Sequence, residues 1–170
     1  GFYLNGIHTK LKGVCVHHDG GCIGAAENRS AIERQVDILT NMGCNAIRLT
    51  HNPFGAEYLD VCQRKGVLLV EELFDCWTKS KKQKDFGRYF ADHYAEVVTS
   101  AIRRDWNNPA VIMWSLGNEA GGYACQDVCY DYMHEMCPEI PTHYEGVIHT
   151  KRKAYDVVSD MYPPHEQVEN

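Results

Sequence analysis

The chain has 170 residues, of which 44% are hydrophobic and 24% charged, and its formal net charge is −6 at pH 7. This composition is typical of a globular protein and excludes a disordered, collagen-like or membrane-embedded chain, since no apolar stretch reaches the roughly 20 residues of a membrane span. Lys and Arg are scattered apart from one short run at 79–84, so no basic face is predicted, and neither nucleic acid nor a membrane is expected as a partner.

Eight cysteines could form a disulfide framework, but such frameworks are typical of short secreted chains that lack a core. Cys125 and Cys129 are one helical turn apart, yet no second pair stands at zinc-ligand spacing. We therefore predict structural thiols that act as small buried hydrophobes, in particular Cys15, Cys44, Cys62 and Cys76. The compartment cannot be read from a chain that starts at Gly1 without Met, although unpaired thiols favour the cytoplasm.

The first half of the chain alternates short apolar runs with segments of helical period. Ser30 and Glu33 predict a capping box at a helix start, and Gly43 supplies the stop for that helix. Gly66 closes the next helix in the same way. Strands are predicted at 11–16, 45–49 and 67–70, and helices at 30–42 and 56–65.

The second half continues the same alternation after a polar stretch at 79–87, which carries no apolar period and predicts a long solvated loop. Pro109 ends the connection between the helix predicted around 90–102 and the strand predicted at 111–116. The remaining patterns predict helices around 90–102 and at 122–136, and strands at 111–116, 143–145 and 157–162. The chain therefore carries about six strands.

Continuously apolar strands separated by amphipathic helices predict a parallel sheet covered by helices. A doubly wound sheet would usually carry a Gly-rich phosphate loop, but residues 17–21 lack both GxGxxG and the lysine of a P-loop. A (β/α)₈ barrel instead gathers functional polar residues at the carboxyl ends of its strands. Each predicted strand here ends in such residues: His17; His51 and Asn52; Glu71, Glu72 and Asp75; Asn118 and Glu119; Glu145; and Tyr162. We predict an α/β fold, an incomplete (β/α)₈ TIM barrel of about six βα units.

Glu119 is the main candidate for chemistry, because it closes an apolar strand whose end lies at the predicted barrel mouth. A carboxyl group in that place is partly desolvated and can donate a proton near neutral pH. A structural interpretation is that Glu119 only occupies the first turn of the next helix, where the helix dipole favours it. Spacing alone leaves these two interpretations open.

The acid/base signature of glycoside hydrolase family 2, which includes β-galactosidases and β-glucuronidases, resembles residues 114–119 (Trp-Ser-Leu-Gly-Asn-Glu). The preceding segment 104–109 (Arg-Asp-Trp-Asn-Asn-Pro) also resembles that family. Three further segments resemble the barrel of that family in the right order: 11–14, 45–53 and 70–72. The resemblance thus covers essentially the whole chain and implies that 1–170 is a partial TIM-barrel catalytic domain. It also implies a carbohydrate substrate, and a parent enzyme that is a homo-oligomer with additional β-sandwich domains.

The resemblance carries site roles onto individual residues. It makes Glu119 the acid/base, Asn118 the partner of the sugar 2-hydroxyl, and His51 a group that binds sugar hydroxyls. His17 and Tyr162 resemble sugar-facing residues after the first and sixth strands. Asp75 is a further substrate-binding candidate. His, Asn and Tyr suit hydroxyl groups because each can donate and accept, although a lone His on an apolar strand is often a satisfied core residue. Trp77 could stack on a sugar or simply be packed.

Two departures from the family pattern affect the predicted chemistry. Some members hold magnesium with Glu-x-His after the third strand, whereas residues 72–77 here read Glu-Leu-Phe-Asp-Cys-Trp, so we predict no metal site and no cofactor. Retaining enzymes also need a second carboxylate about 5 Å from the acid/base. In the family that Glu lies on strand seven, beyond Asn170. Glu145, on strand five, is interpreted as lining the site or as structural.

The sequence therefore predicts hydrolysis of terminal β-glycosides, β-galactosides above all, with retention of configuration in the parent enzyme. The 170-residue chain by itself is expected to be inactive. The alternatives are a truncated barrel that binds sugar without catalysis, a β-glucuronidase or β-mannosidase specificity, and a related barrel glycosidase that acts on β-glucans.

Overall fold

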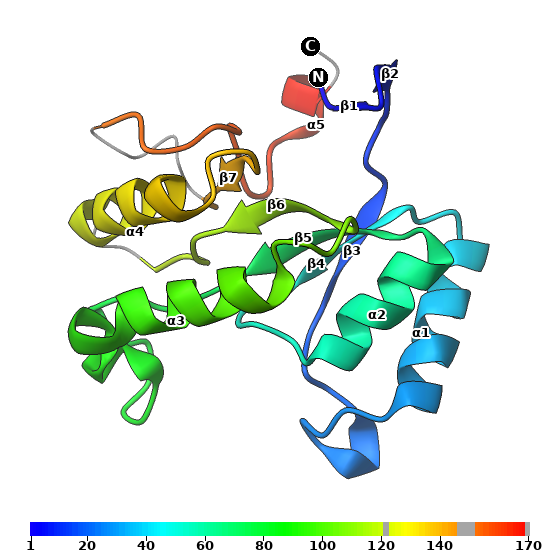
Figure 1. Ribbon diagram of the computed structural model, residues 1–170, viewed down its shortest axis with the longest axis horizontal. Coiled ribbons are helices and arrows are strands. Elements are labelled where there is room, and N and C mark those ends of the chain that lie inside the picture. The colour runs from blue at the N-terminus through cyan, green and yellow to red at the C-terminus, as the bar shows by residue number, and fades with distance from the viewer. Residues whose placement is uncertain (121–122, 146–151, 169–170) are drawn as a thin grey trace.

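The computed structural model describes residues 1–120, 123–145 and 152–168, and its centre is a parallel five-stranded sheet (Figure 1). The strands are β3 (Gly13–Val16), β4 (Ala46–Leu49), β5 (Leu68–Glu72), β6 (Val111–Ser115) and β7 (Thr142–His143), in that order across the sheet. Strands that neighbour in the sequence also neighbour in the sheet. That order is the one a barrel requires, whereas a doubly wound sheet reverses direction at a switch point. The predicted α/β barrel class is therefore confirmed, with the circle of strands incomplete.

Four long helices follow the strands. They are α1 (Arg29–Asn41), α2 (Ala56–Lys65), α3 (Phe90–Asp105) and α4 (Tyr123–Met136). Helix α1 packs beside α2 and α3 beside α4, and α1, α2 and α3 lie on the same side of the sheet (Figure 1). Short elements complete the described chain: the hairpin β1 (Tyr3–Leu4) and β2 (Ile7–His8), the 3-10 turns η1 (Gly21–Ile23) and η2 (Phe86–Arg88), and α5 (His165–Val168). Within the described residues, no helix is both long and apolar enough to cross a membrane.

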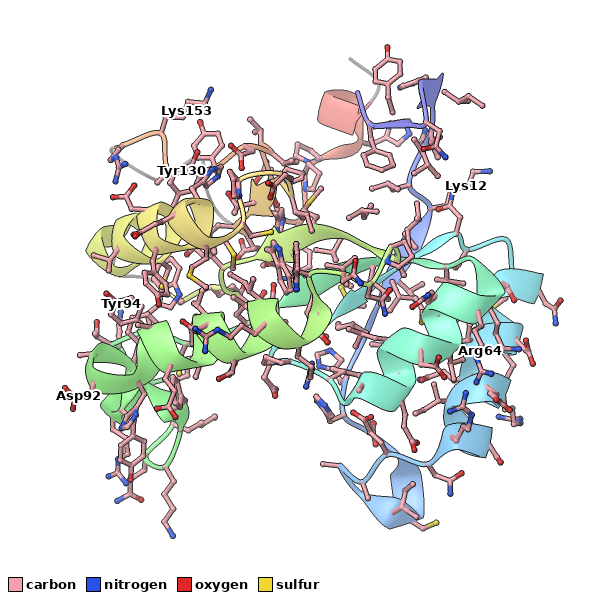
Figure 2. All side chains as sticks on the ribbon, in the orientation of Figure 1. Lys12, Arg64, Asp92, Tyr94, Tyr130 and Lys153 are labelled. Atoms are coloured by element: carbon pink, nitrogen blue, oxygen red, sulfur yellow. The ribbon has the colours of Figure 1, made fainter. Side chains whose placement is uncertain are left out.

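The two faces of the sheet have different surroundings, because successive strand residues point to opposite sides. The outer face packs against the helices and carries fully buried side chains such as Ile47, Leu69 and Trp114. Side chains fill the space between sheet and helices (Figure 2). Tyr94 of α3 contacts Tyr132 of α4 edge to face. The inner face carries Cys15, Arg48, Val70 and Met113, which are neighbours in the strand register, and beyond them Glu72, Ser115 and His143. The inner face is thus the polar one.

Two element predictions were wrong in detail. Helix α1 begins at Arg29, with Asn28 as its N-cap: the Asn28 side chain accepts a hydrogen bond from the Ala31 amide at 3.2 Å, so the Ser30 capping box is not formed. The predicted sixth strand is reduced to an isolated bridge between His143 and Val157. Its apolar run is only two residues long, and Val158 is already 68% exposed, so there is too little buried surface to extend pairing.

The cysteine prediction is partly confirmed. Cys62 and Cys76 are buried, but Cys44 is half-buried and Cys15 is exposed, because it lies on the inner face of the first strand of the sheet. All cysteines whose side chains are described are free, and the side chain of Cys125 lies outside that part of the chain.

Glu71 was predicted to lie at the barrel mouth, but it points to the outer face. It pairs in register with Trp114 and is fully buried, with Arg104 Nη2 3.3 Å from its Oε1. The other oxygen, Oε2, has no hydrogen-bond partner among the described residues. Burial, reinforced by the nearby Asp105 carboxylate, raises the pKa of Glu71 to about 9. Glu71 therefore carries a proton at neutral pH.

We expect Glu71→Gln to flatten the pH dependence of stability. The ordinary pKa of a glutamate is 4.5, so between that pH and about 9 the folded state holds a proton that the unfolded chain has released. The free energy of unfolding therefore falls as pH rises through this window, and Gln, which does not titrate, removes that contribution. Denaturant midpoints measured at about pH 5 and about pH 9 test this. Equal slopes for both proteins would show that Glu71 does not hold the proton.

Candidate active site

The carboxyl ends of three strands gather a polar network on the inner face, with Glu72 at its centre. The Glu72 side chain is fully buried and accepts hydrogen bonds from Arg48 Nε at 2.9 Å, from Arg48 Nη2, from His51 Nδ1 and from Ser115 Oγ. Burial alone would raise the pKa of this carboxyl. The bond to His51 and the charge of Arg48 outweigh burial and hold the pKa below its usual value. Glu72 is therefore ionised and anchors the residues around it.

The network fixes His51. An ionised carboxylate only accepts, so the His51 Nδ1 atom must donate to Glu72, and this bond leaves Nε2 on the opposite side of the ring. The exposed ring of His17 lies edge-on to His51, with centroids 5.1 Å apart, and its Nδ1 is 3.3 Å from Thr50 Oγ1. Both histidines line a cavity of about 470 Å³ together with Asn52 and Asp75. Three of the predicted site residues, His17, His51 and Asp75, thus share one cavity.

Asn118 is joined to the same network. It is buried, and its side-chain Oδ1 accepts a hydrogen bond from Arg48 Nη2 at 3.1 Å. With the amide oxygen turned to Arg48, the amide nitrogen points away from it and remains a donor. Arg48 therefore bridges Glu72 and Asn118.

Glu119 follows at the end of β6 with its side chain exposed, so the expected desolvation is not found among the described residues. Its φ is +44°, in the left-handed region that non-glycine residues seldom adopt. The Glu119 amide donates to Glu145 Oε2 at 2.6 Å, and Glu145 is itself buried. This contact joins the segments that follow β6 and β7.

Lys81 shows that the loop predicted at 79–87 is more than a solvated charge run. Its ammonium donates to the backbone oxygen of Asn118 at 2.7 Å and to Asp75 Oδ1 at 2.9 Å. Asp85 holds the loop in place by accepting the amides of Lys81 and Lys82 at 2.6 and 2.7 Å. Sequence reasoning missed this residue because a lysine in a polar loop carries no signal that separates it from its neighbours.

Two aromatic candidates, Trp77 and Tyr162, do not contact the polar network around Glu72. Trp77 is fully buried; its Nε1 donates to the Leu116 carbonyl at 3.0 Å and its ring lies against Tyr144, so it is packed. A Cβ on Gly117 would come within 2.9 Å of Trp77 Nε1, which explains glycine at that position. Tyr162 is 88% exposed and follows the isolated bridge at Val157, and the structure does not bring it to the other candidates.

His143 belongs to the polar network around Glu72, and the sequence did not predict it as a site residue. It lies at the end of β7, with Nδ1 3.0 Å from Ser115 Oγ. Burial, together with the charge of Arg48, lowers its pKa to about 4, so the ring is neutral. No group of three potential metal ligands occurs among the described residues, and the absence of a metal site stays a prediction.

The fold and the polar network around Glu72 define a (β/α)-barrel domain that gathers polar side chains at the carboxyl ends of its strands. The chain belongs to glycosyl hydrolase family 2, since the model of that family's TIM barrel domain matches residues 1–170. The predicted resemblance is therefore confirmed.

Individual relatives agree with that assignment. A beta-galactosidase of Bacteroides ovatus is 52% identical over 119 residues, which cover 70% of this chain and 14% of the relative. A putative beta-glucuronidase of Formosa agariphila is 42% identical over 120 residues, covering 70% of this chain and 12% of the relative. The crystal structure of a beta-glycosidase from Bacteroides vulgatus superposes with a TM-score of 0.82 at 38% identity, covering 85% of this chain and 19% of that one. The chain thus spans about one seventh of the first relative's length.

Proposed function

We propose that residues 1–170 are part of the catalytic barrel of a retaining β-glycosidase, with Glu119 as the general acid/base. The observation that carries the proposal is the position of the Asn118–Glu119 pair: it follows β6 and is joined through Arg48 and Lys81 to the network of His51 and Asp75, in a chain of this hydrolase family. In such a reaction the acid protonates the departing glycosidic oxygen and then, as a base, removes a proton from the attacking water. An exposed carboxyl at the rim can reach both.

The neighbouring residues fit the recognition of a sugar. The bond from Arg48 leaves the Asn118 amide nitrogen as a donor, and the bond to Glu72 uses only Nδ1 of His51, so the amide nitrogen and the His51 Nε2 atom can both bind sugar hydroxyl groups. His17 and Asp75 line the same cavity as His51. We propose these four as substrate-binding residues. Tyr162 remains a candidate only through the resemblance.

Glu145 is not proposed as the nucleophile. A carboxylate that attacks the anomeric carbon needs an oxygen facing the sugar, and one oxygen of Glu145 is occupied by the Glu119 amide. Glu145 is also buried at 6% exposure. The nucleophile is proposed to lie outside the described residues.

For the substrate, we propose a terminal β-galactoside in preference to a β-glucuronide. The support is the 52% identical relative, which is named a beta-galactosidase, against 42% for the putative beta-glucuronidase.

A panel of chromogenic aryl β-glycosides, tested on the full-length protein that carries this chain, examines both parts of the proposal. We expect kcat/KM for the β-galactoside to exceed that for the β-glucuronide by at least about tenfold, as when a site pairs polar groups of one sugar and not of the other. The α-galactoside and the Glu119→Gln protein serve as controls. A preference for the β-glucuronide would overturn the sugar assignment alone, and no hydrolysis of any β-glycoside would overturn the activity.

A further inference from the structure

The peptide group between Asn118 and Glu119 is bound at both of its polar atoms by charged side chains. Its carbonyl oxygen accepts from the Lys81 ammonium at 2.7 Å, and its N–H donates to the Glu145 carboxylate at 2.6 Å. Each contact is a charge-assisted hydrogen bond, with a cation on the oxygen and an anion on the N–H. The two side chains come from different parts of the chain, the loop after β5 and the segment after β7. Together they fix the rotation of this peptide plane.

The backbone at this point needs such support. Glu119 has a φ of +44°, a conformation that is strained for an L-residue with a side chain. With the peptide plane held, the φ of Glu119 sets the direction of its Cα–Cβ bond relative to that plane, and a change of φ would relieve the conformation and turn this bond. The direction of that bond decides where the Glu119 carboxyl stands relative to a leaving group at the rim.

Lys81 is itself held in position for this contact. Asp85 accepts the amides of Lys81, Lys82 and Gly87, and these backbone bonds hold the pKa of Asp85 down at about 2. The loop is seated against the core, since a Cβ on Gly87 would come within 2.6 Å of the Trp77 backbone oxygen. Asp75, in the segment that follows β5, accepts from the same ammonium. The Lys81 side chain is therefore a fixed part of the rim.

We propose that Lys81 and Glu145 are positioning residues that clamp the Asn118–Glu119 peptide from opposite sides and so aim the carboxyl of Glu119 at the leaving oxygen. This inference rests on the proposed role of Glu119 as acid/base. Neither residue touches the substrate in this arrangement; both act through the peptide group that they hold. Loss of the clamp should weaken proton donation more than sugar binding.

The test compares variants of the full-length protein on two β-galactosides that differ only in the leaving group, one alkyl and one dinitrophenyl. Lys81→Met removes the bond to the carbonyl oxygen, and Lys81→Arg restores a cationic donor. Lys84→Met is the matched control, because Lys84 lies in the same loop, is exposed and makes no contact that the described structure records. Glu145→Gln removes the negative charge that accepts a hydrogen bond from the Glu119 N–H, and it keeps the size of the buried side chain.

Lys81→Met should lower kcat/KM for the alkyl galactoside by at least about tenfold, the effect expected from losing one hydrogen bond to a charged group, and change the dinitrophenyl value much less. Lys81→Arg should recover part of the loss, and Glu145→Gln should show the same selectivity with a smaller loss. Lys84→Met should match the wild type on both substrates.

An equal loss on both substrates, or Lys81→Met behaving like Lys84→Met, would overturn the clamp. If Lys81→Met does not fold, the Lys81→Arg and Glu145→Gln variants test the clamp. An equal loss of kcat/KM on both substrates in Glu145→Gln would contradict the clamp. The proposed function fails separately, if Glu119→Gln itself shows no dependence on the leaving group.

Discussion

Glu119→Gln in the full-length protein should lower kcat/KM by about 10²–10⁴-fold on β-galactosides with alkyl or sugar leaving groups, the range that a positioned general acid contributes. Dinitrophenyl galactoside should lose far less kcat/KM, because its leaving group departs without a proton. Its kcat should still fall, since the same carboxyl is needed as a base when water releases the sugar from the enzyme.

Steady-state kinetics on the two substrate types measure this difference. Glu135→Gln is a suitable control, because Glu135 is exposed on α4, away from the carboxyl ends of the strands. Similar losses of kcat/KM for good and poor leaving groups would show that Glu119 does not donate the proton.

Arg48→Met should destabilise the fold by about 3–5 kcal/mol, because it leaves the fully buried Glu72 carboxylate without its cation. Glu72 is also bound by His51 and Ser115, so the remaining network is strained rather than abolished. The pKa of Glu72 is lowered in the folded wild type, so its stabilising contribution is present above the usual value of 4.5 and is lost as pH falls through the folded value. The variant should lack that loss of stability in acid.

Denaturant unfolding at neutral pH measures the effect of Arg48→Met. Arg64→Met provides the control, since Arg64 and its partner Asp60 are 57% and 47% exposed and such pairs contribute at most about 1 kcal/mol. Adding Glu72→Gln to Arg48→Met should recover part of the loss, because the unpaired charge is then gone. A destabilisation no larger than that of Arg64→Met, or no recovery in the double variant, would contradict a buried charged network centred on Glu72.

The barrel class was predictable because the strands are short, apolar and separated by helices with one apolar face. Gly43, with a φ of +94°, and Gly66, in the left-handed conformation at the end of α2, stop helices as expected. The segment at 157–162 was not predictable, because two adjacent valines satisfy a strand pattern whether or not a neighbouring strand buries them. Asn28 and Ser30 are both good cap residues, and only the extended backbone at Asn28 selects the first.

In the candidate site, the Asn118–Glu119 pair, His51 and His17 could be found because each directly follows an apolar strand. Glu71 and Glu72 could not be told apart, since adjacent residues of a strand face opposite sides and the apolar residues before them do not show which side of β5 faces inward. Lys81 could not be found either, because its contact with the Asn118 carbonyl depends on how Asp85 folds the loop.

The chemical role of Glu119 is tested most directly by the product that Glu119→Ala makes from dinitrophenyl β-galactoside in the presence of azide. Without the carboxylate, the small anion can reach the sugar held on the nucleophile and attack it from the face that water uses. The expected result is azide-accelerated turnover with formation of the β-galactosyl azide, identified by NMR. An α-galactosyl azide would make Glu119 the nucleophile instead, and turnover of Glu119→Ala at the wild-type rate with no azide product would remove Glu119 from the chemistry altogether.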